Sequence, residues 1–492
     1  MKFQNPGDAL FRLIKSMSRK EKLFFQRLCM RRESSKGKIY FKLFQAIDGQ
    51  IESNEPLLKN KFKEQGLQFA ETKRYLYAEV IDALVQYNLG NADKSLYQYL
   101  FEAEVLLDKG LFDLYELLLF KLRSIAVEKN DFLVVLETLL REKRLLIMKF
   151  RDADGERLKE IRKQEVHYNS LHSEVEDYIQ LLVEILPFKN KYSKIASSKF
   201  LDFAKRSLFK DHGKPRSVMA QRLLYNLRAE YYRILGDFQL SFNEYYKEVE
   251  LVESNPRFQY SNPKITLAAF MNCAISCLDL KRYDNALEYV EKCKKFVTRY
   301  PSLLNNRMLS ISSYELAIYR QTRRYKNALA LVEDVKEKIE KREYISDQKR
   351  IILFYLNSAF VCLDMKENQL SQKLLNWIIN FPDVQKTNFL FYYNARVLQL
   401  INIYELKQYE LLESRLRAFR RFVLKQGPLN GVDKSFLNFF GKVFESNYLD
   451  TPRELKRMRT QLKTSIEHAL NDSAEGGAYL FLPDFLNWLK SN

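Results

Sequence analysis

The feature that most constrains the fold is a motif in which an aromatic residue follows a turn-like pair and precedes a small residue by three positions. It is clearest as Tyr283 and Ala286 in KRYDNA and as Tyr325 and Ala328 in RRYKNA. From an anchor at Phe238 onward, successive anchors are spaced 45, 42, 43 and 41 residues apart. Self-similarity at such a period indicates a repeat array. We therefore expect a fold built from one unit of about 42 residues.

The same motif recurs with lower fidelity elsewhere in the chain. The further anchors are Phe112, Asn368 and Tyr409, with Phe150 and Tyr192 as weaker ones. A small residue stands nine positions before four of the anchors, at Ala103, Ala229, Ala274 and Ala359. A helix can approach its neighbour closely only where the side chain is short, so these alanines predict helix crossings.

The residues after each anchor predict a second helix. Apolar residues recur at helical spacing after Tyr283, as they do after Tyr325, which predicts one buried face. The chain has 14 Gly and 11 Pro among 492 residues, so few residues would interrupt long helices. Tyr283 is expected to fill the space between its own helix pair and the next, while Ala286 lets the second helix sit close.

This combination of small residue, turn, aromatic and apolar stripe resembles the tetratricopeptide repeat. The best copy is LRAEYYRILGDFQLSFNEYYKEV at 227–249. The resemblance implies antiparallel helix pairs stacked into a right-handed superhelix whose concave face holds a peptide or a partner's helix. The period here exceeds the family's 34 residues, so each helix should gain about one turn. The segment INIYELKQYELLESRLRAFRRFVLK, 401–425, also resembles an uncharacterised bacterial family of long-helix repeat proteins, a resemblance that implies no chemistry.

We therefore predict an all-α protein. A right-handed α-solenoid of tetratricopeptide-like hairpins spans 93–450, a small helical domain spans 1–92, and capping helices span 451–492. Within the last segment, an apolar stretch that includes Phe485 and Trp488 either folds back as a cap or docks in a partner's groove.

The first 92 residues carry their own helix signals. Ser18 and Glu21 form a predicted capping box, Gly37 a predicted turn, and Asn54 a predicted N-cap. The segment is either a capping bundle or a helix-turn-helix reader of nucleic acid. In the second case Lys73 and Arg74 would contact the nucleic acid.

The charge of the chain is strongly positive and unevenly distributed. The formal net charge is +19, which favours association with polyanions or acidic surfaces. Residues 15–42 and 189–222 each carry ten basic and two acidic side chains, whereas 90–188 carries 14 basic and 19 acidic ones. No apolar run is long enough to span a bilayer, and the first residues lack a secretory core. We expect a cytoplasmic protein with no membrane association and with its five cysteines reduced.

No catalytic motif is present in the sequence. There is no phosphate-cradling glycine loop, nucleophile elbow or HExxH helix, and the chain has four histidines. Cys273, Cys277 and Cys293 could gather three thiolates around zinc, but they stand where the repeat places small buried residues. We predict no enzyme activity, no small-molecule substrate, no cofactor and no metal.

Two groups of residues are the candidate binding sites. Asn226, Asn272 and Asn357 recur on the first helices of three repeats, where their amides could hold an extended peptide or could bridge neighbouring helices. A basic run without acids forms the second group, which comprises Arg415, Arg417, Arg420, Arg421 and Lys425. Such a run could bind phosphates or an acidic peptide, or could be a solvated outer face.

These observations favour a non-enzymatic scaffold or adaptor that binds a protein or peptide, including an acidic one, in the concave face. The alternative is a nucleic-acid-binding regulatory protein that uses the basic N-terminal segment and the basic patches of the solenoid.

Overall fold

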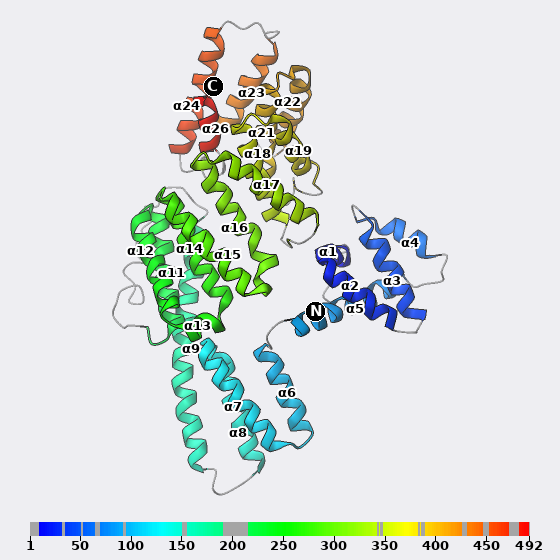
Figure 1. Ribbon diagram of the computed structural model, residues 1–492, viewed down its shortest axis with the longest axis vertical. Coiled ribbons are helices and arrows are strands. Elements are labelled where there is room, and N and C mark those ends of the chain that lie inside the picture. Colours follow the sequence, from blue (N-terminus) through cyan, green and yellow to red (C-terminus); the bar gives the residue numbers. More distant parts are fainter. Residues whose placement is uncertain are drawn as a thin grey trace. The chain divides into compact units, whose positions relative to one another are not determined.

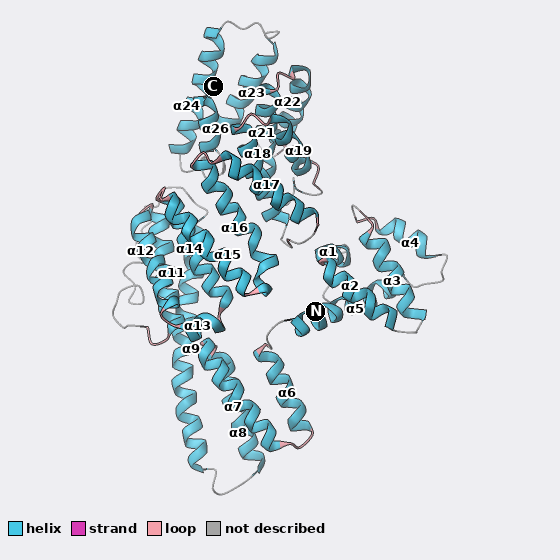
Figure 2. Ribbon diagram, viewed as in Figure 1, coloured by secondary structure: helices cyan, strands magenta, loops and turns pink. Residues whose placement is uncertain are grey.

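The computed structural model describes most of the chain. Its described residues are 9–31, 35–50, 53–63, 69–91, 95–149, 155–189, 215–341, 344, 348–381, 384, 389–425, 431–445, 452–471 and 482–491. Every regular element within these ranges is a helix, and no strand occurs among them (Figure 2). The expected all-α class is confirmed. No helix in the described ranges is long and apolar enough to cross a lipid bilayer.

The chain divides into two compact units. One unit comprises Met1–Ser95 with Val297–Ser310 and Val332–Ile351, and the other comprises the remainder. The described part of the first 95 residues forms five helices, namely α1 (Ala9–Ser16), α2 (Arg19–Arg31), α3 (Ser35–Asp48), α4 (Glu55–Lys63) and α5 (Phe69–Asn91). Their apolar faces meet in one core that includes Ile14, Phe25, Leu43 and Val80.

The helix signals of this segment are mostly confirmed. The Ser18 backbone N–H donates to Glu21 Oε2 at 2.7 Å, and the Glu21 N–H donates to Ser18 Oγ at 3.2 Å, which completes the capping box. Asn54 Oδ1 accepts from the Leu57 N–H at 3.1 Å as the N-cap of α4. The predicted turn at Gly37 is wrong, because α3 already begins at Ser35 and includes this glycine.

The second unit begins with helices that contact one another in chain order (Figure 1). They are α6 (Leu96–Asp108), α7 (Phe112–Lys129), α8 (Phe132–Lys149), α9 (Gly155–Lys189), α11 (Val218–Leu235), α12 (Phe238–Glu253), α13 (Pro256–Ser261) and α14 (Pro263–Asp279). The 35-residue α9 occupies the stretch where the sequence motif is weakest. The weak anchors Phe150 and Tyr192 lie outside the described residues.

Four further helices cross the division between the two units, and six more follow within the described residues of the second unit. The first four are α15 (Tyr283–Arg299), α16 (Pro301–Gln321), α17 (Tyr325–Glu340) and α18 (Gln348–Asp364). The others described toward the C-terminus are α19 (Asn368–Ile379), α21 (Phe389–Glu405), α22 (Tyr409–Leu424), α23 (Gly431–Glu445), α24 (Pro452–Asn471) and α26 (Leu482–Ser491).

One turn geometry recurs before each strong anchor. Each strong anchor is the first residue of a helix; these anchors are Phe112, Phe238, Tyr283, Tyr325, Asn368 and Tyr409. Two residues before them stand the left-handed residues Gly110, Gly236, Lys281, Arg323, Lys366 and Lys407, with φ between 54° and 81°. At the Tyr283 turn the Arg282 N–H donates to the Cys277 carbonyl at 2.8 Å, and the Lys281 N–H to that of Leu278 at 3.0 Å. This is the Schellman ending of a helix, and the equivalent bonds occur at the other turns.

The predicted crossing points are buried. The four alanines that stand nine residues before an anchor are fully buried; they are Ala103, Ala229, Ala274 and Ala359. Ala286 and Ser371, which follow their anchors by three residues, are also fully buried. The Ser371 hydroxyl donates to the Ala359 carbonyl at 3.1 Å, so α18 and α19 approach to backbone contact at this pair of small residues. Tyr283, by contrast, is only half-buried, which does not fit the expectation that it fills the space between its own helix pair and the next.

The last described helix, α26, packs on the chain itself. Phe485 is buried and lies against the rings of Phe360 and Phe436, with centroid distances of 5.5 and 5.6 Å. The Trp488 indole N–H donates to Glu405 Oε1 at 2.8 Å. Its aromatic residues therefore contribute to the core formed with α18, α21 and α23 rather than standing free.

Candidate partner-binding surfaces

Two of the three predicted asparagines converge on one carboxylate. Glu248 of α12 is fully buried and accepts hydrogen bonds from Asn226 of α11 at 3.3 Å and from Asn272 of α14. Arg222 of α11 donates from Nε to the other carboxylate oxygen at 2.9 Å. These asparagines therefore bridge three neighbouring helices, which is one of the two roles that their spacing predicts.

Glu248 is an exception within the repeat. It stands ten residues after its anchor, where the other helices place the buried apolar residues Cys293, Val335, Ile378 and Phe419. Burial raises the pKa of Glu248, while Arg222, Asn226 and Asn272 oppose this change by stabilising the carboxylate. Asn357, the third predicted asparagine, donates to the Leu353 carbonyl of its own helix at 3.0 Å and does not join the cluster.

The four arginines of the basic run lie on α22, Lys425 is the C-cap directly after it, and the run is divided between two faces. Four members of the run are exposed, namely Arg417, Arg420, Arg421 and Lys425. Arg417 forms an ion pair with Glu413, one turn earlier in the helix. Arg415 is half-buried, and its Nε has no hydrogen-bond acceptor among the described residues. Phe419 and Phe422 are buried, as their spacing predicts. The structure thus brings three of the arginines and Lys425 to solvent and turns Arg415 away from them.

The two N-terminal candidates have different surroundings. Lys73 of α5 donates from Nζ to Glu55 Oε2 of α4 at 2.7 Å, and this hydrogen bond lowers the pKa of Glu55. Arg74 is exposed, with its guanidinium 5.4 Å from the Tyr75 ring centroid. Lys73 therefore joins two helices, whereas Arg74 faces solvent.

The candidate cysteines lie in the core. Cys273, Cys277 and Cys293 are all buried. Burial raises the pKa of the Cys277 thiol to about 11 and that of Cys293 to about 12. In the described part of the chain, no group of three or more His, Cys, Asp or Glu side chains is placed to hold a metal ion.

An apolar surface on α6 and α7 was not among the sequence candidates. Each helix buries one stripe, yet each also carries large apolar side chains on the opposite side. We define the α6–α7 apolar surface by its exposed members Tyr97, Phe101, Val105, Leu114, Leu117 and Phe120. Their exposed fractions range from 43% to 71%, with Phe101 at 71% and Phe120 at 67%. Isolated exposed apolar residues are ordinary, but stripes at helical spacing indicate an interaction surface.

A groove adjoins this surface at Phe120. It has a volume of about 300 Å³ and is lined by Glu116, Leu119 and Phe120 of α7, Glu142 and Leu146 of α8, and Arg157 of α9. Leu119 and Leu146 are buried and form an apolar floor. Arg157 Nε donates to Glu142 Oε1 at 2.6 Å, and Arg123 pairs with the other oxygen of that carboxylate. The groove therefore combines an apolar floor with a carboxylate that binds guanidinium groups.

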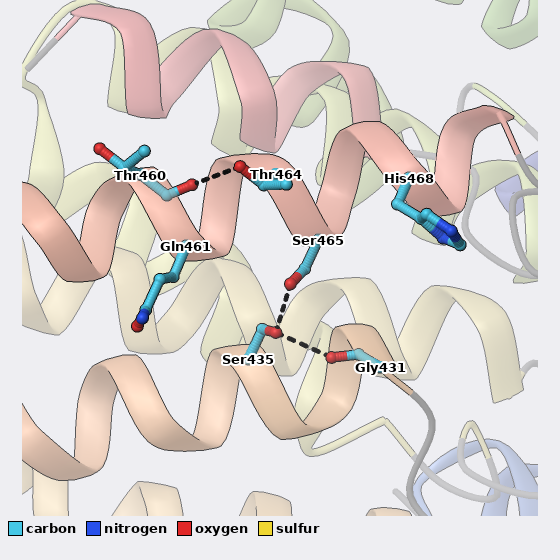
Figure 3. A pocket seen from close by; sticks show the side chains of 7 residues that line it. All are labelled: Gly431, Ser435, Thr460, Gln461, Thr464, Ser465 and His468. Carbon is cyan, nitrogen blue, oxygen red and sulfur yellow. Dashed lines mark hydrogen bonds between the residues drawn. The ribbon is translucent and has the colours of Figure 1, made fainter.

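A larger hollow of about 600 Å³ lies between α23 and α24. Ser435 and Ser465 point toward each other from the two helices, and their hydroxyls are 2.8 Å apart (Figure 3). The hydroxyls of Ser435, Thr460 and Thr464 also lie within 3.0 Å of backbone carbonyls four residues earlier. Because these hydroxyls already donate within the chain, the hollow offers few free donors to a ligand.

Comparisons with protein-family models and with curated proteins found no match. The sequence does contain a signal for the α6–α7 apolar surface, because LYQYLFEAEVLLD and FDLYELLLF place apolar residues on both sides of a helix. Such a helix is either buried all round or binds a partner.

Proposed function

We propose that the protein is a non-enzymatic, cytoplasmic scaffold that binds a partner protein through the α6–α7 apolar surface. The observation that carries this proposal is the pair of outward stripes that expose Phe101 and Phe120 by about two thirds or more. Exposed aromatic side chains on rigid helices are typical of the anchors that dominate protein–protein affinity. The recurring Schellman turns and buried small residues support a right-handed solenoid with a period near 42 residues.

The concave-face role of the asparagines is a weaker part of the proposal. Asn226 and Asn272 already share the Glu248 carboxylate, so a peptide backbone would have to compete with that contact. The α6–α7 apolar surface has no such competitor within its own two helices. For this reason we place partner binding on α6 and α7 first.

The test uses the full chain and a double variant, Phe101→Ser with Phe120→Ser. Both proteins are incubated with native lysate, cross-linked at lysines and analysed by mass spectrometry. We expect a stoichiometric protein whose cross-links reach the exposed Lys109 or Lys121, which flank the surface, and whose capture is lost in the double variant. Equal capture by the double variant would contradict the proposal. Met148→Ser is the matched control, because Met148 is 65% exposed on α8 and does not line the groove.

Nucleic-acid binding is the second candidate function. It is supported by the exposed Arg420, Arg421 and Lys425, which form no ion pair with a described residue. Phosphate contacts of this kind weaken by orders of magnitude between about 50 and 200 mM salt. A purified chain that ignores single-stranded and duplex nucleic acid at the lower salt concentration would rule this function out. Salt-sensitive binding that Arg420→Ala and Arg421→Ala reduce would support it.

A further inference from the structure

We propose that Arg396 of α21 and Arg415 of α22 form an anion site that binds the carboxylate of a glutamate or aspartate side chain in a peptide segment of a partner protein. The inference goes beyond the proposed function, which concerns the helices α6 and α7.

The guanidinium of Arg396 is held only by neutral groups. Its Nε and Nη2 donate to the Tyr392 hydroxyl oxygen, and its Nη1 donates to Gln399 Oε1 at 3.3 Å. Its Cζ also lies 5.0 Å from the centroid of the Tyr392 ring. A guanidinium has five N–H donors, so one N–H on each terminal nitrogen remains for a further acceptor. The side chain is half-buried and forms no ion pair with a carboxylate of the described residues.

Arg415 is a second arginine without a compensating charge. It is half-buried and forms no ion pair or hydrogen bond with a described residue. Its Nε is enclosed and has no acceptor among those residues. A buried donor without an acceptor costs folding free energy, because its hydration is lost and nothing replaces it. Such a donor in a native fold therefore indicates a ligand that the chain itself does not supply.

The contacts between α21 and α22 place the two arginines at the same level of this helix pair. The rings of Tyr392 and Phe422 lie 4.8 Å apart, and those of Tyr393 and Phe419 lie 5.5 Å apart. Later residues of α21 thus meet earlier residues of α22, so the helices are antiparallel. One arginine stands four residues after Tyr392 and the other four residues before Phe419, and residues four apart share a helix face. Both arginines therefore stand on the faces where the two helices meet.

The helices around the two arginines carry an excess of positive charge. α21 contacts both α19 and α22 (Figure 1). These three helices contain six basic and three acidic side chains, and α19 contains no acidic one. Of the three acids, Glu405 accepts from the Trp488 indole, Glu413 pairs with Arg417, and Glu410 is exposed in the first turn of α22. Complementary charge therefore favours an acidic partner.

The surroundings fit an acidic residue that has an apolar neighbour in its own chain. The planar fork of an arginine matches a carboxylate with two parallel hydrogen bonds. Gln399, which holds Arg396, donates to Asn376 of α19 at 3.0 Å, and the next residue of α19 is Trp377, which is 37% exposed. Phe389 of α21 is also 37% exposed. Exposed aromatic rings give the apolar neighbour a surface on which to pack.

A peptide fits this site better than a nucleic acid does. Nucleic acid is held by a row of exposed cations that follows its phosphates. Arg396 and Arg415 are instead half-buried at one level of a helix pair, so they suit a single small anionic group.

The first test selects random peptides displayed on phage for binding to the full chain. The selected peptides are then sorted by whether the double variant Arg396→Met, Arg415→Met still binds them. We expect the peptides that need the two arginines to share a glutamate or aspartate beside an aromatic or aliphatic residue. Arg417→Met is the matched control, because it removes an exposed arginine of α22 that already pairs with Glu413. This control should bind the same peptides as wild type.

The second test measures one arginine-dependent peptide by fluorescence anisotropy, with its acidic residue and with the matching amide. The amide should bind wild type about tenfold more weakly, because it lacks the charge-assisted pair. Arg396→Met should bind both forms with the same low affinity, which shows that the carboxylate and this arginine act on each other. Arg396→Lys keeps the charge but not the planar fork, so its affinity should be intermediate. Circular dichroism melting separates these effects from loss of folding.

The proposal fails if no selected peptide depends on the two arginines, or if the dependent peptides lack an acidic residue. It also fails if the amide loses as much affinity for Arg396→Met as for wild type, or if Arg417→Met weakens binding as much as Arg396→Met does. A phosphoserine peptide that binds about tenfold tighter than the glutamate peptide would assign the site to phosphate instead. Displacement of the peptide by a single-stranded oligonucleotide would assign it to nucleic acid.

The α6–α7 apolar surface is tested separately. The double variant Phe101→Ser, Phe120→Ser should bind the selected peptide as wild type does. Loss of lysate capture in that variant with unchanged peptide binding keeps both proposals, whereas absence of acidic peptides with capture intact removes only the anion site.

Discussion

The α6–α7 pair and the α11–α12–α14 cluster depart from an ordinary helical repeat in opposite directions. In the first, large apolar side chains such as Phe101 and Phe120 lie in solvent. In the second, the carboxylate of Glu248 lies where four other repeats bury an apolar residue. The turn and the small residues at the helix crossings are nevertheless kept in both regions.

This difference shows which residues are constrained by the packing of the helix pairs and which can vary. The Schellman turn and the crossing alanine fix the backbone of each helix pair, because both are set by steric limits. The exposed side chains of α6 and α7 differ in type from an ordinary solvent-facing surface, and Glu248 replaces a buried apolar residue. Both differences are compatible with those steric limits. We therefore attribute the fold to the turns and crossings, and we propose that the departures from the pattern serve the function.

The largest expected effect comes from removing the cation that compensates Glu248. Arg222→Met leaves this buried carboxylate with hydrogen bonds from Asn226 and Asn272 but no positive charge. We expect the free energy of unfolding to fall by about 3 kcal/mol, as measured by urea denaturation.

The double variant Arg222→Met with Glu248→Leu is the control for this loss. It restores the apolar residue type of the other repeats, and replacement of a buried ion pair by apolar groups is often neutral. We expect most of the lost stability to return. A double variant as unstable as Arg222→Met alone would show that the polar cluster is required for the fold.

A smaller loss of stability is expected from overpacking a helix crossing. Both regions have such crossings at buried alanines, and the crossing of α18 with α19 is of the same kind. Ala359→Leu inserts a larger side chain where the Ser371 hydroxyl reaches the Ala359 carbonyl at 3.1 Å. Overpacking of this kind should destabilise the chain by about 2 kcal/mol in urea denaturation. Unchanged stability would contradict the close approach of α18 and α19.

Removal of a turn aromatic should have a smaller effect. Tyr283 is half-buried, so Tyr283→Ala should lower the unfolding free energy by about 1 kcal/mol rather than the roughly 3 kcal/mol of a core aromatic. Thermal melting followed by circular dichroism measures it. A loss of stability as large as that caused by Arg222→Met would show that Tyr283 packs as a core aromatic residue, as the sequence predicts.

The pH dependence of folding stability tests the protonation of Glu248 directly. Its pKa in the folded chain is raised by burial, so the folded state binds more protons than the unfolded state just above the ordinary glutamate pKa. Stability is therefore lost as the pH rises from the unfolded pKa through the folded one. Glu248→Gln removes this loss, so the stability of the variant relative to wild type should improve as the pH rises from 4 toward neutrality. Parallel pH profiles for the two proteins would contradict the raised pKa.

The sequence predicted those features that depend on local backbone geometry. The anchors from Phe238 to Tyr409 mark helix starts, because the left-handed turn residue and the cap are encoded by neighbouring residues. The alanine positions marked crossings for a similar steric reason. Burial of the anchors was not predictable from the motif, since it depends on the next helix pair in space.

The candidate sites were harder to predict. Asn226 and Asn272 share a partner, Glu248, that lies on a different helix and interrupts an otherwise apolar pattern. The α6–α7 apolar surface was missed because a helix with two apolar faces does not reveal which of them lies inside. Only the packing of Leu96 and Leu100 in the core identifies the opposite face, with Phe101, as the exposed one.

The most direct test of the central claim compares stability and partner binding in the Phe101→Ser, Phe120→Ser double variant. If the exposed rings serve binding, urea denaturation should show a change of no more than about 0.5 kcal/mol per substitution, while the cross-linked partner disappears. A loss of several kcal/mol with partner capture unchanged would instead show that both rings belong to the folded core, and the scaffold proposal would fail.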